Sequence, residues 1–463
     1  IYLDIVMKTY LIIIIVIILF IVIYNFVNFD QLNVWLLNYI IVLRGILAPN
    51  CNWFTISDIV LPNNGSGITT YNKFKEQYGD FAPSNMFGDK IYTVTNIKYI
   101  KIILDNSPNI FSVGKMKMKF FKSFMEKNVG VSTGCPWKAR RHMNEVALVT
   151  DKLHIYAKQY NNDIYKQLLK WKPKTELTFS DFSKFGKKMV AKIVFNTDHI
   201  TDSFFKIFSE ANSIEVFYNP NFKIKPKVYN NYIKVLNYYI DNPKPNSLID
   251  LCLTVTHNKE EIRHQIPHFI FPIAGLFITT IPRLLLLLCN HKHIFKKVIQ
   301  EVYSLKDCYM NTYSDIYKLP YLRKCILETL RLNNPVITTF RTLTQDFSFD
   351  EKYSFQKGDQ FLILNNPILR ETEFFENPNK FIPTRWTSKK EDSYYAISFN
   401  QGPQRCPGKE LAIYLTQSFI YNFIKIKEIG RTQSLIGKDL NTDHITQIIN
   451  PCTIKFYFTP LNT

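Results

Sequence analysis

The cysteines of this chain lack the patterns of two common structural uses. None of the eight cysteines belongs to a C-x-x-C pair, so a zinc ribbon is not expected. Their spacing does not match a small disulfide scaffold either, and reduced, buried thiols are the default in a domain that faces the cytosol. The chain also lacks a fixed-period repeat and a low-complexity linker. No basic run is interleaved with stacking aromatics, so we expect no nucleic-acid partner.

Apolar and basic residues are abundant instead. The chain has 463 residues, of which 46% are hydrophobic and 21% charged, so it can hold one large core or two smaller ones. Lysine and arginine number 57 against 38 aspartates and glutamates, and the formal net charge is +19. Two interpretations of this charge stay open. One is a compositional bias that places extra lysine on a solvated surface, and the other is attraction to anionic lipid or an acidic protein partner.

Residues Thr9–Val27 form an apolar run that is interrupted only by Asn25. Its length approaches the roughly 20 residues that a helix needs to cross the hydrocarbon core of a membrane. A secretory signal peptide is the alternative, but no small-residue cleavage site follows Ile23. We therefore expect an uncleaved, single-pass membrane anchor with aromatic residues at its end.

The segment from Phe399 to Gly408 carries the most chemical information. Gly-Pro and Pro-Gly pairs, which are turn signals, flank Cys406, and apolar residues at helical spacing follow directly. Cys406 is therefore expected on a tight loop just before a helix, where the helix dipole and free N–H groups favour a thiolate. A thiolate in that setting is a strong ligand for ferric iron. The alternative is an inert core thiol.

This segment resembles the haem-binding loop of the cytochrome P450 family, F-x-x-G-x-x-x-C-x-G, which is matched at Phe399, Gly402, Cys406 and Gly408. The resemblance implies that Cys406 is the axial ligand to the iron of haem b (iron protoporphyrin IX). It also implies a mainly α fold with a small β-rich lobe, in which the haem lies between a long central helix and the cysteine loop. Near the C-terminus, two β-rich runs within residues 445–458 predict a hairpin.

Two further motifs occur in the order that the family shows. Glu328 and Arg331 form an E-x-x-R in a strong helical pattern, and this spacing places both side chains on one helix face. The later segment Phe381–Trp386 matches F-x-P-x-R-[FW] and contains Arg385. The resemblance implies a buried network of these three charged residues that supports the haem loop. The alternative for the E-x-x-R is a surface ion pair of little energetic value.

Several basic residues are candidates for contact with the haem propionates. Trp137 and Arg141 lie four residues apart and share a helix face, so both can hydrogen-bond to one carboxylate. The resemblance implies a propionate as that partner, and the alternative is an interfacial tryptophan beside solvated arginines. Arg341 matches a family arginine that meets a propionate from a strand. Gln404 stands where the family commonly has a basic residue, so either Arg405 reaches a propionate or one contact is missing.

The long apolar stretch 269–288 departs from the family pattern. In the family, A-G is followed by one residue, an acid and a threonine that relay protons to bound oxygen. Here Ala274-Gly275 is followed by Phe277 and Ile278 at those two positions. The usual acid–alcohol pair is therefore missing.

Thr279 or Thr280 could take the catalytic role if the helix is locally distorted, and Pro282 favours a distortion. A second membrane helix is the alternative interpretation of this stretch. Prolines within it and Arg283 argue against that alternative.

Three functions stay open at this point. A haem-thiolate monooxygenase would use an NADPH-dependent reductase to insert one oxygen atom from O2 into an apolar substrate such as a lipid, sterol or fatty acid. An isomerase or dehydratase acting on hydroperoxides would need neither proton relay nor reductase. A non-catalytic haem protein is the third.

We expect an anchor over 1–28, a membrane-proximal linker over 29–70 and a catalytic domain over 71–463. The domain would be monomeric, next to membrane lipid, and on the cytosolic side of an endoplasmic-reticulum-like membrane.

Overall fold

The computed structural model describes most of the chain beyond residue 65. The described residues are 52–53, 66–86, 89–113, 117–118, 124–171, 176–211, 223–305, 313–427, 432–435, 445, 449 and 451–458. The predicted anchor over 1–28 lies outside them, as does nearly all of the predicted linker over 29–70. Those two assignments therefore stay predictions.

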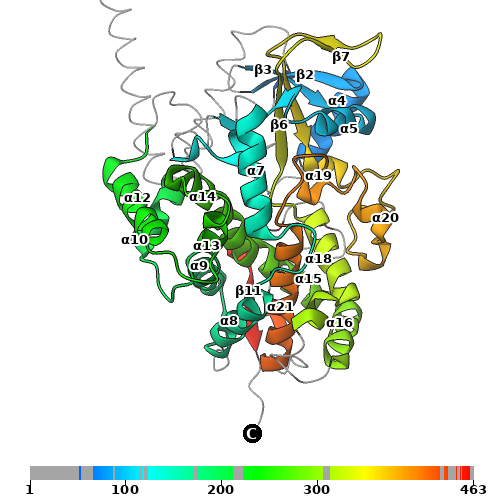
Figure 1. Ribbon diagram of the computed structural model, residues 1–463. Coiled ribbons are helices and arrows are strands. Elements are labelled where there is room, and N and C mark those ends of the chain that lie inside the picture. Colours follow the sequence, from blue (N-terminus) through cyan, green and yellow to red (C-terminus); the bar gives the residue numbers. More distant parts are fainter. Residues whose placement is uncertain are drawn as a thin grey trace, which may run out of the picture.

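Helices make up the larger part of the described structure (Figure 1). The α-helices are α4 Ser66–Tyr78, α5 Ile97–Asp105, α7 Gly134–Leu148, α8 Ala157–Leu169, α9 Phe179–Phe195, α10 Asp202–Ala211, α12 Pro226–Asp241, α13 Leu248–Leu253, α14 Lys259–Gly275, α15 Ile281–Asn290, α16 Lys292–Ser304, α17 Tyr313–Tyr317, α18 Pro320–Leu332, α19 Asn365–Ile368, α20 Ser388–Glu391 and α21 Lys409–Lys427. The shorter helical segments are the π-helix η2 Leu276–Thr280 and the 3-10 turns η1 Val129–Val131, η3 Pro383–Arg385, η4 Ile397–Phe399 and η6 Pro451–Thr453.

The strands are short. Their bounds are β1 Asn52–Trp53, β2 Phe81–Met86, β3 Asp89–Val94, β4 Phe111–Ser112, β5 Glu176–Leu177, β6 Thr338–Leu343, β7 Phe347–Ser348, β8 Ser354–Phe355, β9 Gln360–Leu364, β10 Thr432–Leu435 and β11 Lys455–Phe458. Among the described residues they form a mixed sheet in the order β1-β2-β3-β9-β6-β4, a sheet β10-β11-β5 and the pair β7-β8. The mixed sheet lies at one end of the molecule beside α4 and α5 (Figure 1).

The mixed sheet has a hydrophobic core of its own, separate from the larger helical core. In this smaller core the ring of Phe81 lies 5.0 Å from the rings of Tyr99 and Phe349. The sheet combines parallel pairing of β3 with β9 and antiparallel pairing of β9 with β6, so that Arg341 lies opposite Phe361. The predicted fold class, mainly α with a small β-rich lobe, is confirmed.

One long helical stretch, α14 with η2 and α15, runs through the helical core. The side chain of Asn258 accepts hydrogen bonds from the N–H groups of Glu260 and Glu261, which caps the first turn, and both acids favour the positive helix end. Among the described residues, this is the one helix that is long and apolar enough to cross a membrane, and two thirds of its most apolar window is buried in the protein. This burial supports a core helix rather than a second membrane helix.

Helix α9 lies unusually close to this central stretch at Gly186. A Cβ atom at this position would lie 3.3 Å from the carbonyl oxygen of Ala274 and 3.3 Å from Cγ1 of Ile278. Glycine therefore permits the close approach of two helices that larger residues would separate. Next to this contact the buried ring of Phe277 lies 5.2 Å from that of Phe185.

The predicted hairpin over 445–458 is wrong in its pairing. Its second strand exists as β11, but β11 pairs antiparallel with β10 and with β5. Residues 451–453, which contain the expected turn proline, form the 3-10 turn η6 directly before β11. Local β propensity identified the strand, whereas its partners come from more distant parts of the chain.

Candidate functional site

The cysteine loop is closed by two backbone hydrogen bonds. The carbonyl oxygen of Phe399, at the end of η4, accepts the N–H of Cys406 at 2.8 Å. The carbonyl oxygen of Gly402 accepts the N–H of Arg405 at 3.0 Å. Helix α21 then begins at Lys409, so the cysteine lies three residues before a helix N-terminus, as the sequence predicts.

Gly402 is required by the loop geometry. Its φ of 72° lies in the left-handed region, and a Cβ atom would lie 2.5 Å from the carbonyl oxygen of Leu104 at the end of α5. Gly408 differs, because a Cβ there would make only an ordinary contact of 3.6 Å with Leu148. The contribution of Gly408 is its backbone N–H, which donates a hydrogen bond to the sulfur of Cys406.

The electrostatic surroundings of Cys406 act in opposite directions. Burial raises the pKa of the thiol, and this is the largest effect. The N–H of Gly408 and the positive charges of Arg141 and Lys409 act to lower that pKa. The groups expected to stabilise a thiolate are therefore present, but burial has the larger effect on the pKa and keeps the thiol protonated. A metal ion that replaces the proton would stabilise the thiolate.

Glu328 lies at the centre of a buried hydrogen-bond network. Its two carboxylate oxygens accept from Nε and Nη2 of Arg331, both at 2.9 Å, and from Nε of Arg385 at 3.1 Å. The indole N–H of Trp386 donates at 2.9 Å and the N–H of Ile382 at 3.0 Å. The side chains of Glu328 and Arg331 are both 0% exposed, which excludes the surface ion pair. Helix α18, which carries this pair, packs against η4 at the start of the cysteine loop.

Arg141 connects helix α7 to the cysteine loop. Its Nη1 donates to the carbonyl oxygen of Arg405 at 2.6 Å, and its Nε pairs with Glu145 at 2.7 Å. Trp137 lies one turn earlier on the same helix face and is half-buried. Arg141 is buried, and the side chain of its neighbour Arg140 is 14% exposed and pairs with Glu261, so neither is the solvated arginine of the alternative interpretation.

The other two predicted cofactor arginines have contrasting environments. Arg341 is buried in β6, where it donates to Oγ of Ser107 and to the carbonyl oxygen of Phe340, both at 2.8 Å. Burial lowers its pKa to about 10. The guanidinium of Arg405 is exposed and pairs with Asp151 at 2.5 Å. This position favours the alternative in which one propionate contact is missing from the cysteine loop.

The helix distortion predicted near Thr279 is present. The N–H of Ile281 bonds to the carbonyl oxygen of Leu276, five residues earlier, within the π-helix η2. Pro282 explains the location, because it has no N–H to offer the carbonyl group of Ile278 four residues before it.

The two threonines of η2 differ in accessibility. The hydroxyl of Thr279 donates to the carbonyl oxygen of Gly275 at 2.7 Å, and its side chain is half-buried. Thr280 is 3% exposed. Phe277, at the position of the usual acid, is 0% exposed and packs on Phe185. Thr279 is therefore the better placed of the two for contact with a bound molecule.

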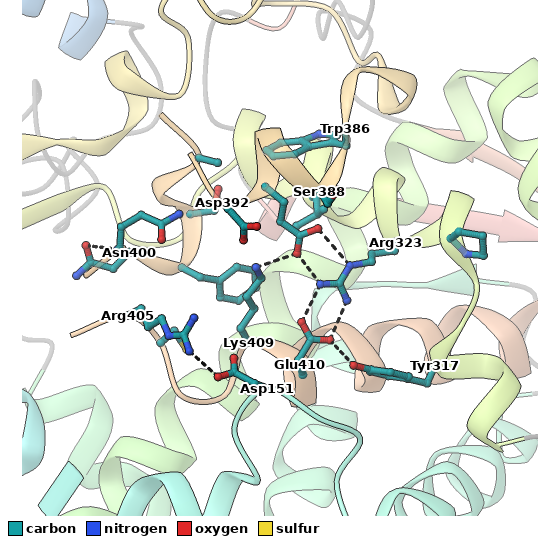
Figure 2. Close-up of a pocket in the computed structure, with 18 of the residues that line it drawn as sticks. Asp151, Tyr317, Arg323, Trp386, Ser388, Asp392, Asn400, Arg405, Lys409 and Glu410 are labelled. Carbon is teal, nitrogen blue, oxygen red and sulfur yellow. Dashed lines mark hydrogen bonds and ion pairs between the residues drawn. The ribbon is translucent and has the colours of Figure 1, made fainter. Parts of the chain in front are cut away.

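A cavity of about 590 Å³ borders the cysteine loop and is lined in part by Cys406 (Figure 2). Arg323 lies in it between Glu391 and Glu410, with Nη2 at 2.5 Å and 2.7 Å from their carboxylates. Lys409 pairs with Glu391 at 2.8 Å. These contacts join α18, α20 and α21. No sequence motif marked them, since charged residues with ordinary spacing carry no sign of their distant partners.

The residues of this site fit an iron protoporphyrin. A sulfur donor, Cys406, lies on a loop that the buried Arg141 contacts, and a second buried arginine, Arg341, lies on β6. The two hydrogen bonds of Arg341 go to neutral oxygens, so its charge is not balanced by those partners. Buried guanidinium groups of this kind suit the two carboxylates of a porphyrin.

Comparison with known proteins agrees with this assignment. The family model described as Cytochrome P450 matches residues 179–425, more than half of the chain. Among curated relatives, Beta-amyrin 11-oxidase of Glycyrrhiza uralensis is 26% identical over 45% of this chain and 44% of its own. Probable cytochrome P450 508A4 of Dictyostelium discoideum is 32% identical over 42% of each chain.

Solved structures support the same fold over a longer part of the chain. The retinoic acid bound cyanobacterial CYP120A1 superposes with a TM-score of 0.70 at 17% identity, covering 88% of this chain and 96% of its own. By sequence, the chain spans less than half the length of the first curated relatives that it matches. The match of the family model, together with this fold, shows that the chain belongs to the cytochrome P450 family.

Proposed function

We propose that this protein is a haem-thiolate monooxygenase that inserts one oxygen atom from O2 into an apolar substrate of the lipid, sterol or fatty-acid class. The observation that carries the proposal is Cys406, held on a closed loop with its sulfur accepting the N–H of Gly408. When bound, haem b supplies the activation of O2 with two electrons. Names of relatives such as Beta-amyrin 28-monooxygenase of Medicago truncatula support an apolar substrate.

The cysteine loop would set the properties of the iron site. Cys406 donates its sulfur as the metal ligand, and the Gly408 N–H shares the negative charge of that sulfur. Phe399 closes the loop through its carbonyl group, while Gly402 allows the loop to pass against α5. The network around Glu328 would hold α18 rigid behind this loop.

Three side chains would orient the cofactor through its carboxylates. Trp137 and Arg141 would reach the cofactor from α7, and Arg341 would reach it from β6. Charge-assisted hydrogen bonds from rigid guanidinium groups fix position as well as adding affinity. Thr279 would hold the proton needed on the oxygen-binding side, in place of the missing acid–alcohol pair.

The proposal includes partners and location. Two electrons per turnover require a redox partner, for which we propose an NADPH-dependent reductase. The predicted anchor over 1–28 would place a monomeric catalytic domain beside membrane lipid, on the cytosolic side of an endoplasmic-reticulum-like membrane. An apolar substrate dissolved in the bilayer would then be concentrated near the enzyme.

The test begins with the spectrum of the reduced protein under carbon monoxide. A thiolate ligand is expected to shift the Soret band far to the red, and Cys406→Ala is expected to abolish that shift. Cys135→Ala is the control, because Cys135 is exposed. Substrate turnover should then require NADPH and reductase. Purified protein without haem, or with nitrogen-ligated iron, would refute the proposal.

A second function is favoured by the helix η2. Phe277 is fully buried among aromatic rings, and the hydroxyl proton of Thr279 already bonds to Gly275. An isomerase or dehydratase that rearranges a hydroperoxide needs no proton relay and would tolerate this arrangement. Turnover of lipid hydroperoxides without electron donor would select this function. Reversible gas binding without turnover in either assay would indicate a non-catalytic haem protein.

A further inference from the structure

The long central helix has one face that is accessible, which we call the open face. Its members follow each other at spacings of four, three and four residues and are His268, Pro272, Gly275 and Thr279. Such spacings place side chains on one side of a helix. All of these residues are at least partly accessible, whereas most residues between them are buried. A Cβ atom at Gly275 would meet no atom within 4 Å, so the open face borders free space.

The open face is apolar in its middle and polar at both ends. One end is the hydroxyl of Thr279, and the other is the imidazole of His268. Pro272 and Gly275, which lie between them, contribute no polar side-chain atom. At 1.5 Å per residue, His268 lies about 10 Å from Gly275 and about 16 Å from Thr279 along the helix. A molecule that contacts both ends is therefore long and mostly apolar.

His268 has hydrogen-bonding groups that the described part of the protein does not use. No described residue forms a hydrogen bond with its ring nitrogens, and both nitrogens are accessible. Burial, followed by the charges of Lys117 and Arg141, lowers the pKa of the ring to about 4. The imidazole is therefore neutral at pH 7, with one N–H to donate. Pro272 leaves an acceptor beside it, because it has no N–H to offer the carbonyl oxygen of His268 four residues earlier.

The preceding turn of α14 fixes the surroundings of the imidazole. The side chain of Gln265 is 0% exposed, accepts the N–H of Val129 at 2.9 Å and donates to the carbonyl oxygen of Lys127 at 2.8 Å. These two bonds attach the segment before α7 to α14. In that segment, a Cβ atom at Gly130 would lie 3.5 Å from Cε1 of His268. The ring thus lies against a fixed segment on one side and stays accessible on another.

We propose that His268 is a specificity-determining residue that binds a hydroxyl group of an elongated apolar substrate, whose reacting carbon lies beside Gly275 and Thr279. This inference rests on the proposed haem-thiolate function. The hydroxyl oxygen accepts the imidazole N–H, and the hydroxyl proton is donated to the carbonyl oxygen of His268. A carboxylate fits less well, because it has no proton to donate to that oxygen. The reacting carbon lies about 10 to 16 Å from the hydroxyl group.

The experiment measures ligand affinity of the full-length, haem-loaded protein through the change in Soret absorbance. Two matched pairs of ligands are dodecan-1-ol with tridecane, and cholesterol with cholest-5-ene, and only the first member of each pair has a hydroxyl group. Wild type is compared with His268→Leu, His268→Gln and the control His257→Leu, since His257 is exposed in the loop before α14. The ratio of variant to wild-type affinity for one ligand is independent of that ligand's solubility.

His268→Leu is expected to bind the alcohol of at least one pair about 3- to 10-fold more weakly than wild type, the effect of losing a hydrogen bond between neutral groups. Its affinity for the matching hydrocarbon should stay within about twofold of wild type, because that ligand forms no such bond. His268→Gln, which keeps a donor and an acceptor, should also stay within about twofold for the alcohol, as should His257→Leu.

Three results would overturn the inference. They are equal weakening of alcohol and hydrocarbon, which indicates a purely structural role, unchanged affinity for both alcohols in His268→Leu, and a wild type that binds neither alcohol. A larger loss for dodecanoate than for dodecan-1-ol would overturn the choice of a hydroxyl group. In all these cases a red-shifted carbon monoxide spectrum would leave the haem-thiolate function intact. A wild-type protein that binds no haem would instead refute the function itself.

Discussion

Replacing Glu328 by glutamine is expected to destabilise the protein strongly. The two oxygens of this fully buried carboxylate accept hydrogen bonds from the side chains of Arg331, Arg385 and Trp386 and from the N–H of Ile382. An amide removes the negative charge and turns one acceptor into a donor that faces a guanidinium group. Removing one partner of a buried ion pair typically costs 3–5 kcal/mol, because the other charge stays buried. We therefore expect a loss of about 3–5 kcal/mol for Glu328→Gln.

The assay is equilibrium urea unfolding of the holoprotein at matched haem content, followed by far-ultraviolet circular dichroism and by Soret absorbance. Glu373→Gln is the control, since Glu373 is exposed and its loss should change stability by less than about 0.5 kcal/mol. The Soret transition should precede the loss of helix in Glu328→Gln, because the network lies directly behind the cysteine loop. A Glu328→Gln protein within about 1 kcal/mol of wild type would refute the reasoning that this network is a major source of stability.

Three further predictions follow from individual residues. Gly402→Ala should lose its thiolate-type carbon monoxide spectrum, because the added Cβ would lie 2.5 Å from a carbonyl oxygen of Leu104; an unchanged spectrum would contradict this. Burial lowers the pKa of His154 to about 4 from 6.5, so its contribution to stability is complete above pH 6.5 and is lost as the pH falls toward 4. Urea unfolding should show a free energy of unfolding about 3 kcal/mol lower at pH 4 than at pH 6.5, and His154→Gln should make this pH dependence weaker. Thr279→Ala should raise hydrogen peroxide release per NADPH, and equal release from both proteins would exclude Thr279 as the proton holder. Phe277→Asp should not restore a relay but lower stability by several kcal/mol, since it buries an unpaired carboxyl group.

Much of the site follows from spacing in the sequence. The turn residues around Cys406 place it on a loop before a helix, and Pro282 marks the helix distortion because a missing N–H is a local property. The three-residue spacing of Glu328 and Arg331 likewise places them on one helix face. These features depend on a few neighbouring residues and their backbone chemistry, which a sequence records directly.

Other parts of the site depend on contacts between distant segments. Arg405 lies next to the ligand in sequence, yet its side chain turns outward to Asp151 in the turn before α8. Lys117 and His268 come from distant parts of the chain, and both lie close to Gly130 because the fold brings these parts together. The strand β11 pairs with β10 and β5 for the same reason. No pattern of neighbouring residues encodes such meetings, so sequence reasoning did not find them.

The π-helical turn η2 has a consequence for protein engineering. It inserts one extra residue into a helical turn, and one residue corresponds to a rotation of about 100° around a regular helix. Side chains after residue 280 therefore point in a different direction from the one expected for a regular α-helix continued from Ala274. A substitution beyond Thr280 that is copied from another enzyme by alignment alone would therefore point about 100° away from the intended direction. Designs in this segment should count backward from α15, whose orientation already includes the extra residue.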